Sequence, residues 1–457
     1  MIDFLREAAN VAPSKRQLAW FDRKFYAFIH FGVNTFTDRE WGDGTEPESI
    51  FNPEKLDCRQ WARALSGAGM KGMILTAKHH DGFCLWPSRY TEHSVKNCPV
   101  KRDVVGEAAQ ACREAGIGFG IYLSPWDRNS AYYGTPEYND YYCNQLEELL
   151  TQYGELFCVW LDGACGEGPN GKKQEYDFQR YIGLVRKHQP NAVIFFDRGP
   201  DVRWCGNEAG NARASEWAVV PGELCWYGDV QTGPGPLAQE GDLSYLYNTD
   251  SNVGGLSNIL YSKGLTFVPS EINTSIRRGW FWHKEEEPKS LEKLFRIYIS
   301  SVGGNACLNL NIPPNRDGLL DERDVARLKE LRELLDREFG QALEATVEKR
   351  DTGHPMQPEY MITLAQPTSR IKYVELMEDI SVGQRVEGFR IEAVFSNGGQ
   401  FPLFQGTTIG NRKICVLTDP FAEQNRLLDD SGVKIDKLLI KITAARGEVN
   451  LKHIAIM

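Results

Sequence analysis

Hydrophobic and polar positions between residues 25 and 339 alternate between short apolar runs and amphipathic segments. Five runs are apolar enough to form buried strands: residues 25–29, 72–78, 118–123, 156–161 and 192–196. Helical patterns lie between them, around Gln60 and over 104–114, 136–153 and 176–188. Strands that alternate with helices form βαβ units and a parallel sheet. We therefore expect an α/β fold, built as a (β/α)8 TIM-like barrel.

The rest of the chain divides into three parts. Residues 199–284 are irregular and Gly-rich, which is typical of functional loops. A helix over 290–301, a last strand over 305–312 and a helix over 322–339 would close the barrel. Short β-rich runs then occupy 346–349, 360–364, 370–375, 384–395 and 437–443, with turn signals at Asn397-Gly398 and Asp430-Ser-Gly432. We expect a catalytic domain over residues 1–340 and an antiparallel β-sandwich over 341–457.

Three of the predicted strands end in polar residues. The run 156–161 stops at Asp162, the run 72–78 at His79-His80, and the run 25–29 at His30. A buried carboxylate is unfavourable unless it has a use, and in a (β/α)8 barrel these strand ends face the active site. Asp162 is therefore a nucleophile or general base, or else the N-cap of a following helix. Trp160 lies two residues earlier and should point to the same side.

Composition narrows the class of protein. The chain of 457 residues is 42% hydrophobic and 25% charged, with a formal net charge of −10. This charge argues against nucleic acid and anionic membranes as partners, and the chain has no apolar run of transmembrane length. Its 11 cysteines lack CxxC pairs, and residues 1–7 have no signal-peptide pattern. A cytoplasmic protein is expected, although a periplasmic or secreted protein trimmed of its leader would look the same.

Further carboxylates and aromatic residues lie in the irregular segment. Glu208, in a Gly-flanked aromatic loop, is a candidate for a second catalytic carboxylate. Glu216 and Glu271 are other candidates for this role. A glycosidase needs two carboxylates, one of them shielded by apolar neighbours such as Trp204 or Trp217. His30, His79 or His80 with Asp162 could instead form the metal site of a barrel hydrolase, but no HxH pair follows the first strand. We expect neither a metal nor a cofactor.

Taken together, these motifs resemble the α-L-fucosidases of glycoside hydrolase family 29. The resemblance covers nearly the whole chain and is carried by five motifs in this order: His30-Phe-Gly32, Glu40-Trp-Gly42, Ala77-Lys-His-His-Asp-Gly-Phe83, Trp160-Leu-Asp-Gly163 and Asn309-Leu-Asn-Ile-Pro-Pro314. It implies a retaining exo-glycosidase whose partner is a fucosylated oligosaccharide or glycoconjugate.

The resemblance also implies roles for individual residues. Asp162 matches the nucleophile, which forms a covalent fucosyl-enzyme. The residues that match sugar contacts are His30, His79 and His80 at the fucose hydroxyls, Glu40 and Trp41 at the sugar's edge, Tyr122 beside the nucleophile, and Trp280 or Trp282 as the wall for the fucose methyl group.

A resemblance to one subfamily of these enzymes implies which residue is the acid/base. Residues 204–210 and 269–283 resemble the subfamily restricted to α-1,3/1,4-linked fucose on Lewis-type glycans, which places the acid/base at Glu208 rather than at Glu216 or Glu271. One alternative is a broad-specificity fucosidase that also accepts α-1,2, α-1,6 or aryl fucosides. Another is a non-catalytic fucose-binding protein. We favour a buttressing role over sugar binding for the C-terminal module, because it has no compact aromatic cluster.

Overall fold

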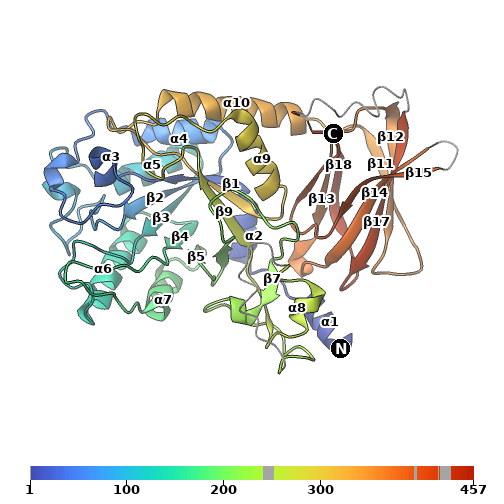
Figure 1. Cartoon of the computed structure of the whole chain (residues 1–457), viewed down its shortest axis with the longest axis horizontal. Helices are drawn as coiled ribbons and strands as arrows, with labels where there is room; N and C mark the ends of the chain where they lie inside the picture. Colours follow the sequence, from blue (N-terminus) through green and yellow to red (C-terminus); the bar gives the residue numbers. More distant parts are fainter. Residues whose placement is uncertain (1, 240–251, 396–398, 420, 422–433) are drawn as a thin grey trace.

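The computed structural model describes residues 2–239, 252–395, 399–419, 421 and 434–457. Figure 1 shows the barrel on one side, an all-β domain on the other, and α10 running over the barrel and ending beside the all-β domain. The expected turns at 397–398 and 430–432 lie outside the described residues. None of the helices in the described ranges is long and apolar enough to cross a membrane.

Eight parallel strands close into the predicted barrel, in the order β1-β10-β9-β6-β5-β4-β3-β2. The strands are β1 (Phe25–Ile29), β2 (Gly72–Lys78), β3 (Gly118–Leu123), β4 (Cys158–Leu161), β5 (Val193–Phe196), β6 (Val202–Trp204), β9 (Ser270–Ser275) and β10 (Cys307–Asn311). The helices outside it include α4 (Cys58–Gly67), α5 (Val104–Ala115), α6 (Glu137–Gln152), α7 (Phe178–His188), α9 (Leu291–Ser301) and α10 (Glu322–Phe339).

The irregular segment contains two barrel strands that the hydrophobic pattern did not reveal. β6 is only three residues long, and β9 reads Ser-Glu-Ile-Asn-Thr-Ser. β9 pairs with β10 through Glu271 and Cys307, and with β6 through Glu271 and Trp204. Between β6 and β9 the chain also forms the two-stranded sheet β7 (Val219–Pro221) and β8 (Leu265–Phe267) and the short helix α8 (Leu256–Ile259).

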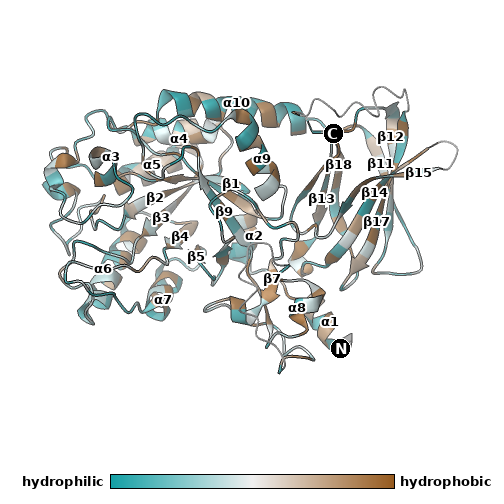
Figure 2. Cartoon of the chain, viewed as in Figure 1, coloured by the Kyte–Doolittle hydropathy of each residue, from teal (hydrophilic) through white to brown (hydrophobic). Residues whose placement is uncertain are grey.

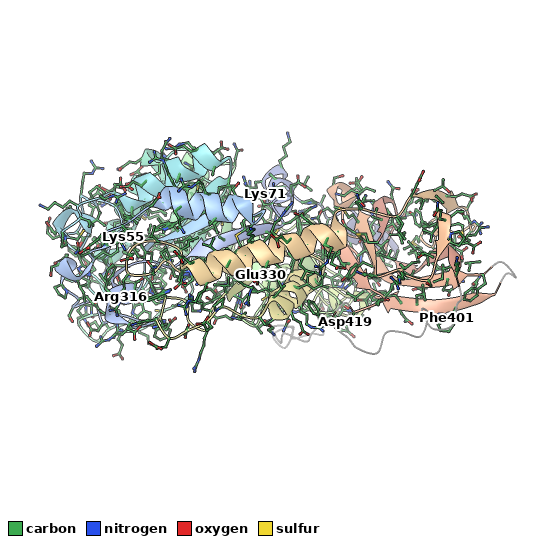
Figure 3. All side chains as sticks on the ribbon, turned by 90° about the horizontal axis from the view of Figure 1, so that it is seen from above. Lys55, Lys71, Arg316, Glu330, Phe401 and Asp419 are labelled. Carbon is green, nitrogen blue, oxygen red and sulfur yellow. The ribbon has the colours of Figure 1, made fainter. Side chains whose placement is uncertain are left out.

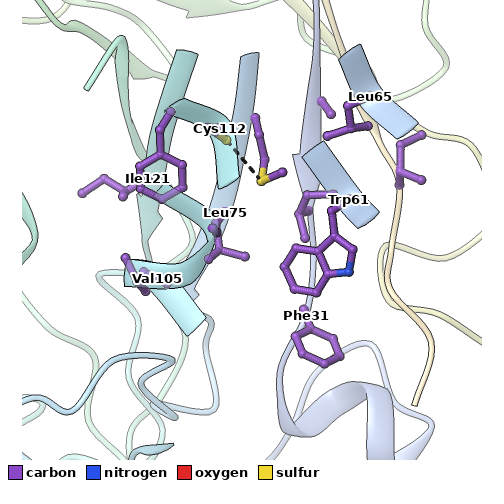
Figure 4. Close-up of a cluster of buried hydrophobic side chains, with 14 of the residues drawn as sticks. Phe31, Trp61, Leu65, Leu75, Val105, Cys112 and Ile121 are labelled. Carbon is purple, nitrogen blue, oxygen red and sulfur yellow. Dashed lines mark hydrogen bonds between the residues drawn. The ribbon is translucent and has the colours of Figure 1, made fainter. Parts of the chain in front are cut away.

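Apolar packing outside the strands holds the helices on the barrel. Figure 4 shows Trp61 and Leu65 of α4, four residues apart, beside Leu75 of β2, while Val105 and Cys112 of α5 lie near Ile121 of β3. This spacing gives a helix one apolar face. On α10 the buried positions include Leu328, Leu331 and Leu335, and its other positions are mostly hydrophilic (Figure 2). Glu330 lies on the exposed side of that helix in Figure 3.

The C-terminal domain is the predicted antiparallel sandwich. One sheet has the order β11-β12-β17-β14-β15 and the other β16-β13-β18, and apolar side chains fill the space between them. The strands are β11 (Ala345–Arg350), β12 (Glu359–Thr368), β13 (Tyr373–Glu378), β14 (Val386–Val394), β15 (Gln400–Gly406), β16 (Lys413–Val416), β17 (Ile435–Ala445) and β18 (Leu451–Ile456). Phe401 of β15 lies at the end of the domain that is remote from the barrel (Figure 3).

The sandwich contacts the loop that follows Glu208. Gln384 donates to the carbonyl oxygen of Glu216 at 3.2 Å and accepts from the amide of Ala218 at 2.8 Å. The guanidinium of Arg446 lies 3.9 Å from the ring centroid of Trp217. These are the contacts of a domain that supports a barrel loop.

Candidate active site

The polar strand ends meet at one cavity on the C-terminal rim of the barrel. Its volume is about 390 Å³. The residues that line it are Phe28, His30, Glu40, Trp41, His79, His80, Tyr122, Trp160, Asp162, Ala164, Glu208, Asn273 and Trp280. A larger cavity of about 570 Å³ lies at the N-terminal end of the strands, but it is lined by basic and apolar residues such as Arg23, Gly118 and Phe157. The rim cavity is the one that brings carboxylates and histidines together.

Asp162 follows the last residue of β4 and is held from two sides. Its Oδ2 accepts from the Tyr122 hydroxyl at 2.7 Å, and its Oδ1 accepts from the amide of Ala164 at 2.8 Å. Burial, together with the charge of Asp162, raises the pKa of Tyr122 well above its ordinary value, so this phenol stays a donor. No helix begins directly after Asp162. The next helix, α7, starts at Phe178 and has Asp177 as its N-cap. The N-cap interpretation is therefore wrong.

Burial favours the neutral form of the three histidines of the cavity. Burial lowers the pKa of His30 to about 4 and lowers the pKa of both His79 and His80. Each has one ring nitrogen engaged by the protein: His30 Nδ1 with Asn311 Oδ1 at 2.9 Å, His79 Nδ1 with Asn34 Nδ2 at 3.4 Å, and His80 Nδ1 with Ser124 Oγ at 2.7 Å. These partners fix which nitrogen carries the proton.

The hydrogen-bond network around the histidines assigns their tautomers. Asn311 uses its NH₂ on Ser275 and Trp280, and the Ser124 hydroxyl donates to Trp126 O, so His30 and His80 donate through Nδ1 and present Nε2 as an acceptor. The Asn34 NH₂ group donates to Asp81 Oδ2 at 3.1 Å and Glu40 O at 3.3 Å and also faces His79 Nδ1; a donor group beside Nδ1 favours the tautomer with the proton on Nε2. His80 Nε2 lies 4.0 Å from Asp162 Oδ2. Two acceptors and one donor thus surround the cavity, a set suited to hydroxyl groups.

Glu208 lies on the loop after β6 and reaches the same cavity. The indole Nε1 of Trp280 donates to its Oε2 at 3.4 Å. Although the residue as a whole is solvent-exposed, partial desolvation of its carboxyl group raises its pKa. The charges of Asp162 and Glu40 raise that pKa further, whereas the hydrogen bond from Trp280 lowers it. A raised pKa is what a general acid requires near neutral pH.

Aromatic rings form one wall of the cavity. The Trp280 ring lies 5.1 Å from that of His30 and 6.4 Å from that of Phe28, while the exposed Trp41 ring lies 5.9 Å from that of His80. Trp282 does not line the cavity, because its indole is turned away to donate to Asp321 at 3.0 Å. Of the two tryptophans expected in the cavity wall, Trp280 lines the cavity and Trp282 does not, so the expectation for Trp282 is wrong.

Comparisons with known proteins identify the family of this chain. A family model described as α-L-fucosidase matches residues 6–216. α-L-Fucosidase 1 of Arabidopsis thaliana is 40% identical over 433 residues, which covers 88% of this chain and 81% of the relative. The chain belongs to the α-L-fucosidase family. This fucosidase is thus a hydrolase with the TIM-barrel architecture of glycoside hydrolase family 29.

Solved structures resemble the fucosidase over almost its full length. A glycoside hydrolase 29 family member from an unknown rumen bacterium is 38% identical, with a TM-score of 0.81 and coverage of 98% of this chain and 77% of the other. A Ruminococcus gnavus GH29 fucosidase, solved in complex with fucose, is 28% identical, with a TM-score of 0.79 and coverage of 98% and 95%.

The other carboxylates considered in the fucosidase lie away from the cavity. Glu271 is fully buried inside the barrel, where it accepts from Tyr26, from Trp160 Nε1 at 2.9 Å and from Asn309 Nδ2 at 3.2 Å. Glu216 is buried with Arg203 and Arg213 as ion-pair partners. Both have structural partners.

Several cavity residues of the fucosidase were not among the sequence candidates. Phe28 lies two residues before His30, so the period of two along a strand, which had already placed Trp160 on the side of Asp162, carries its signal. Asn273, which accepts from Trp204 Nε1 at 2.8 Å, lies on the unpredicted strand β9. Among the described residues, no group of three or more histidines, cysteines or acids is arranged to hold a metal ion.

Proposed function

We propose that this fucosidase is a retaining exo-glycosidase with Asp162 as nucleophile and Glu208 as acid/base. The observation that carries the proposal is that Asp162, oriented by Tyr122 and Ala164, lines the same cavity as a second carboxyl group with a raised pKa. Two such carboxyl groups with different environments are the requirement of double-displacement glycoside hydrolysis.

The reaction proceeds in two displacements. In the first, an oxygen of Asp162 bonds to the anomeric carbon of fucose while the glycosidic C–O bond breaks, and Glu208 gives its proton to the departing oxygen. In the second, Glu208 takes a proton from water as the water oxygen attacks the same carbon and Asp162 leaves. Fucose is released with its original anomeric configuration.

The remaining cavity residues recognise the sugar. The Nε2 atoms of His30 and His80 accept from fucose hydroxyls, and His79 donates to another. Phe28 and Trp280 provide an apolar face for the fucose methyl group. Trp41, which is 59% exposed, lies at the edge of the cavity.

We further propose a preference for α-1,3/1,4-linked fucose on Lewis-type glycans. This preference is supported by the resemblance of residues 204–210 and 269–283 to the subfamily restricted to α-1,3/1,4-linked fucose. The two segments meet where Trp280 contacts Glu208. The test compares fucose release from a Lewis-type trisaccharide, an α-1,2-linked fucoside and an aryl fucoside. Strong preference for the trisaccharide is expected, whereas comparable rates on all three would establish the broad-specificity alternative.

The stereochemical proposal has its own test. Proton NMR of the earliest product should show the α anomer of fucose before mutarotation. Initial release of the β anomer would contradict a retaining mechanism. A protein that bound fucose but released none from any fucoside would be a binding protein.

A further inference from the structure

A single carboxylate ties the loop after β9 to the loop after β1. Glu40 accepts from the backbone amides of Trp280 at 2.8 Å and Phe281 at 3.2 Å, and from His283 Nε2 at 2.7 Å. The close approach of the loops needs the glycine at 279, where a Cβ atom would lie 2.5 Å from Glu40 Oε1 and 2.9 Å from His283 Cδ2. Three of the four acceptor positions of Glu40 are thus used by the protein, which leaves one for a sugar hydroxyl.

His283 connects this carboxylate to a second one. Its Nδ1 lies 2.8 Å from Asp38 Oδ1 and its Nε2 lies 2.7 Å from Glu40 Oε1. A neutral imidazole has only one N–H, so both contacts are hydrogen bonds only when the ring is protonated. The side chains of Asp38 and Glu40 are the charged groups that face the ring, while the Arg277 guanidinium donates to the backbone carbonyl of His283 at 3.4 Å. The two carboxylates raise the pKa of His283 against the opposing effect of burial.

The bridge that His283 forms between Asp38 and Glu40 is connected to the proposed acid/base, Glu208, through Trp280. Trp280, whose amide is held by Glu40, donates its indole N–H to Glu208. The carbonyl oxygen of Trp280 accepts from Asn311 Nδ2 at 2.7 Å, and its ring packs on His30. The position of the indole therefore depends on the bridge at one end of the loop and on the barrel at the other.

We propose that His283, bridging Asp38 and Glu40, is a positioning residue that holds Trp280 in place for Glu208. It touches neither substrate nor reacting atoms, and it acts by fixing the loop whose indole orients the acid/base. The inference rests on the proposed role of Glu208. Loss of the bridge should weaken proton donation and leave the nucleophile unchanged.

Leaving groups of different acidity separate this effect from a general loss of activity. A sugar leaving group needs the proton from Glu208, whereas fluoride or the anion of a very acidic phenol departs with little help. We expect His283→Gln to lower kcat/KM on a fucosylated trisaccharide about tenfold or more, because general acid catalysis contributes ~10²–10⁴-fold and part of it is lost. On α-L-fucosyl fluoride the same variant should keep nearly its full kcat/KM, because this constant ends with the departure of fluoride and does not include the second displacement.

The control is Lys284→Gln, which removes a positive charge from the exposed neighbouring residue and should leave both rates unchanged. Asp38→Asn weakens the bridge from its exposed side and should shift the ratio of the two rates in the same direction, so the test survives poor folding of His283→Gln. Equal losses on both substrates, or unchanged rates on both, would overturn the proposal.

Glu208→Ala, measured in parallel, separates this proposal from the catalytic one. A Glu208→Ala variant that kept its rate on the trisaccharide would overturn the acid/base assignment itself. A large loss in Glu208→Ala, with an unchanged substrate ratio in His283→Gln, would overturn only the role of the bridge.

Discussion

The hydroxyl group of Tyr122 donates to Asp162 Oδ2 at 2.7 Å, across the rim from β3 to β4. This bond holds the carboxylate in one orientation. Because hydrogen bonds to charged groups contribute ~1.5–3 kcal/mol, Tyr122→Phe should lower kcat about 10- to 100-fold with the fold intact. The measurement is steady-state hydrolysis together with the melting temperature. Tyr153→Phe is the matched control, since Tyr153 donates to Asp103 and does not line the cavity. A Tyr122→Phe variant with wild-type kcat would show that the bond has no catalytic role.

Removal of the acid/base should be chemically rescued. Glu208→Ala should lose hydrolysis of natural glycans, while added azide should restore turnover of substrates with good leaving groups, because the small anion fits the space left by the carboxylate and attacks the anomeric carbon in place of water, without a general base. The rescued product is fucosyl azide, measured by mass spectrometry or NMR. Rescue of a Glu216→Ala or Glu271→Ala variant instead would move the assignment to that residue.

The pH profile should depend on Trp280. Glu208 must be protonated to act as an acid, so activity falls as pH rises through its raised pKa. The indole hydrogen bond favours the ionised carboxylate and lowers that pKa, so Trp280→Phe should move the alkaline limb of kcat/KM to higher pH. Trp282→Phe is the control, because its indole faces Asp321, and it should leave the limb where it is. A limb that moves to lower pH in Trp280→Phe would contradict this account.

Glu271 should prove structural. Its carboxyl group accepts hydrogen bonds from Tyr26, Trp160 and Asn309 inside the barrel, and Glu271→Gln places an amide donor among these donors. Since an unsatisfied buried polar group costs about 1–3 kcal/mol, the free energy of unfolding should fall by this amount in denaturant titrations. The alkaline limb of the activity profile should not move. A variant as stable as the wild type would show that the network contributes little.

The strands that could be predicted are β1 to β5, which have apolar runs, and β10, in which leucine and asparagine alternate. β6 and β9 escaped because β6 is short and because β9 turns Glu271 and Asn273 into the barrel, where hydrogen bonds to other strands replace apolar packing. In the C-terminal domain, β15, β16 and β18 were likewise absent from the expected set.

The site residues likewise divide into those that the strand pattern predicts and those that it does not. Asp162 and the histidines follow strands, so their meeting at one rim could be inferred from barrel geometry. Glu208 and Trp280 lie on long loops without periodicity, and the resemblance to a family was needed to choose Glu208 over Glu216 and Glu271 and to give Trp280 a role. The contact between Asp38 and His283 joins residues 245 positions apart, and no local sequence pattern predicts it.

We propose that Asp162 acts by forming a covalent bond to fucose. Asp162→Ala should lose several orders of magnitude in kcat without unfolding, yet loss of activity alone does not show a covalent bond. The direct measurement is mass spectrometry of the wild-type enzyme after inactivation with a 2-deoxy-2-fluorofucosyl fluoride, followed by proteolysis. We expect one fluorofucosyl adduct, on the peptide and side chain of Asp162. An adduct on another carboxylate, or inactivation-free turnover that releases the inverted anomer of fucose, would contradict it.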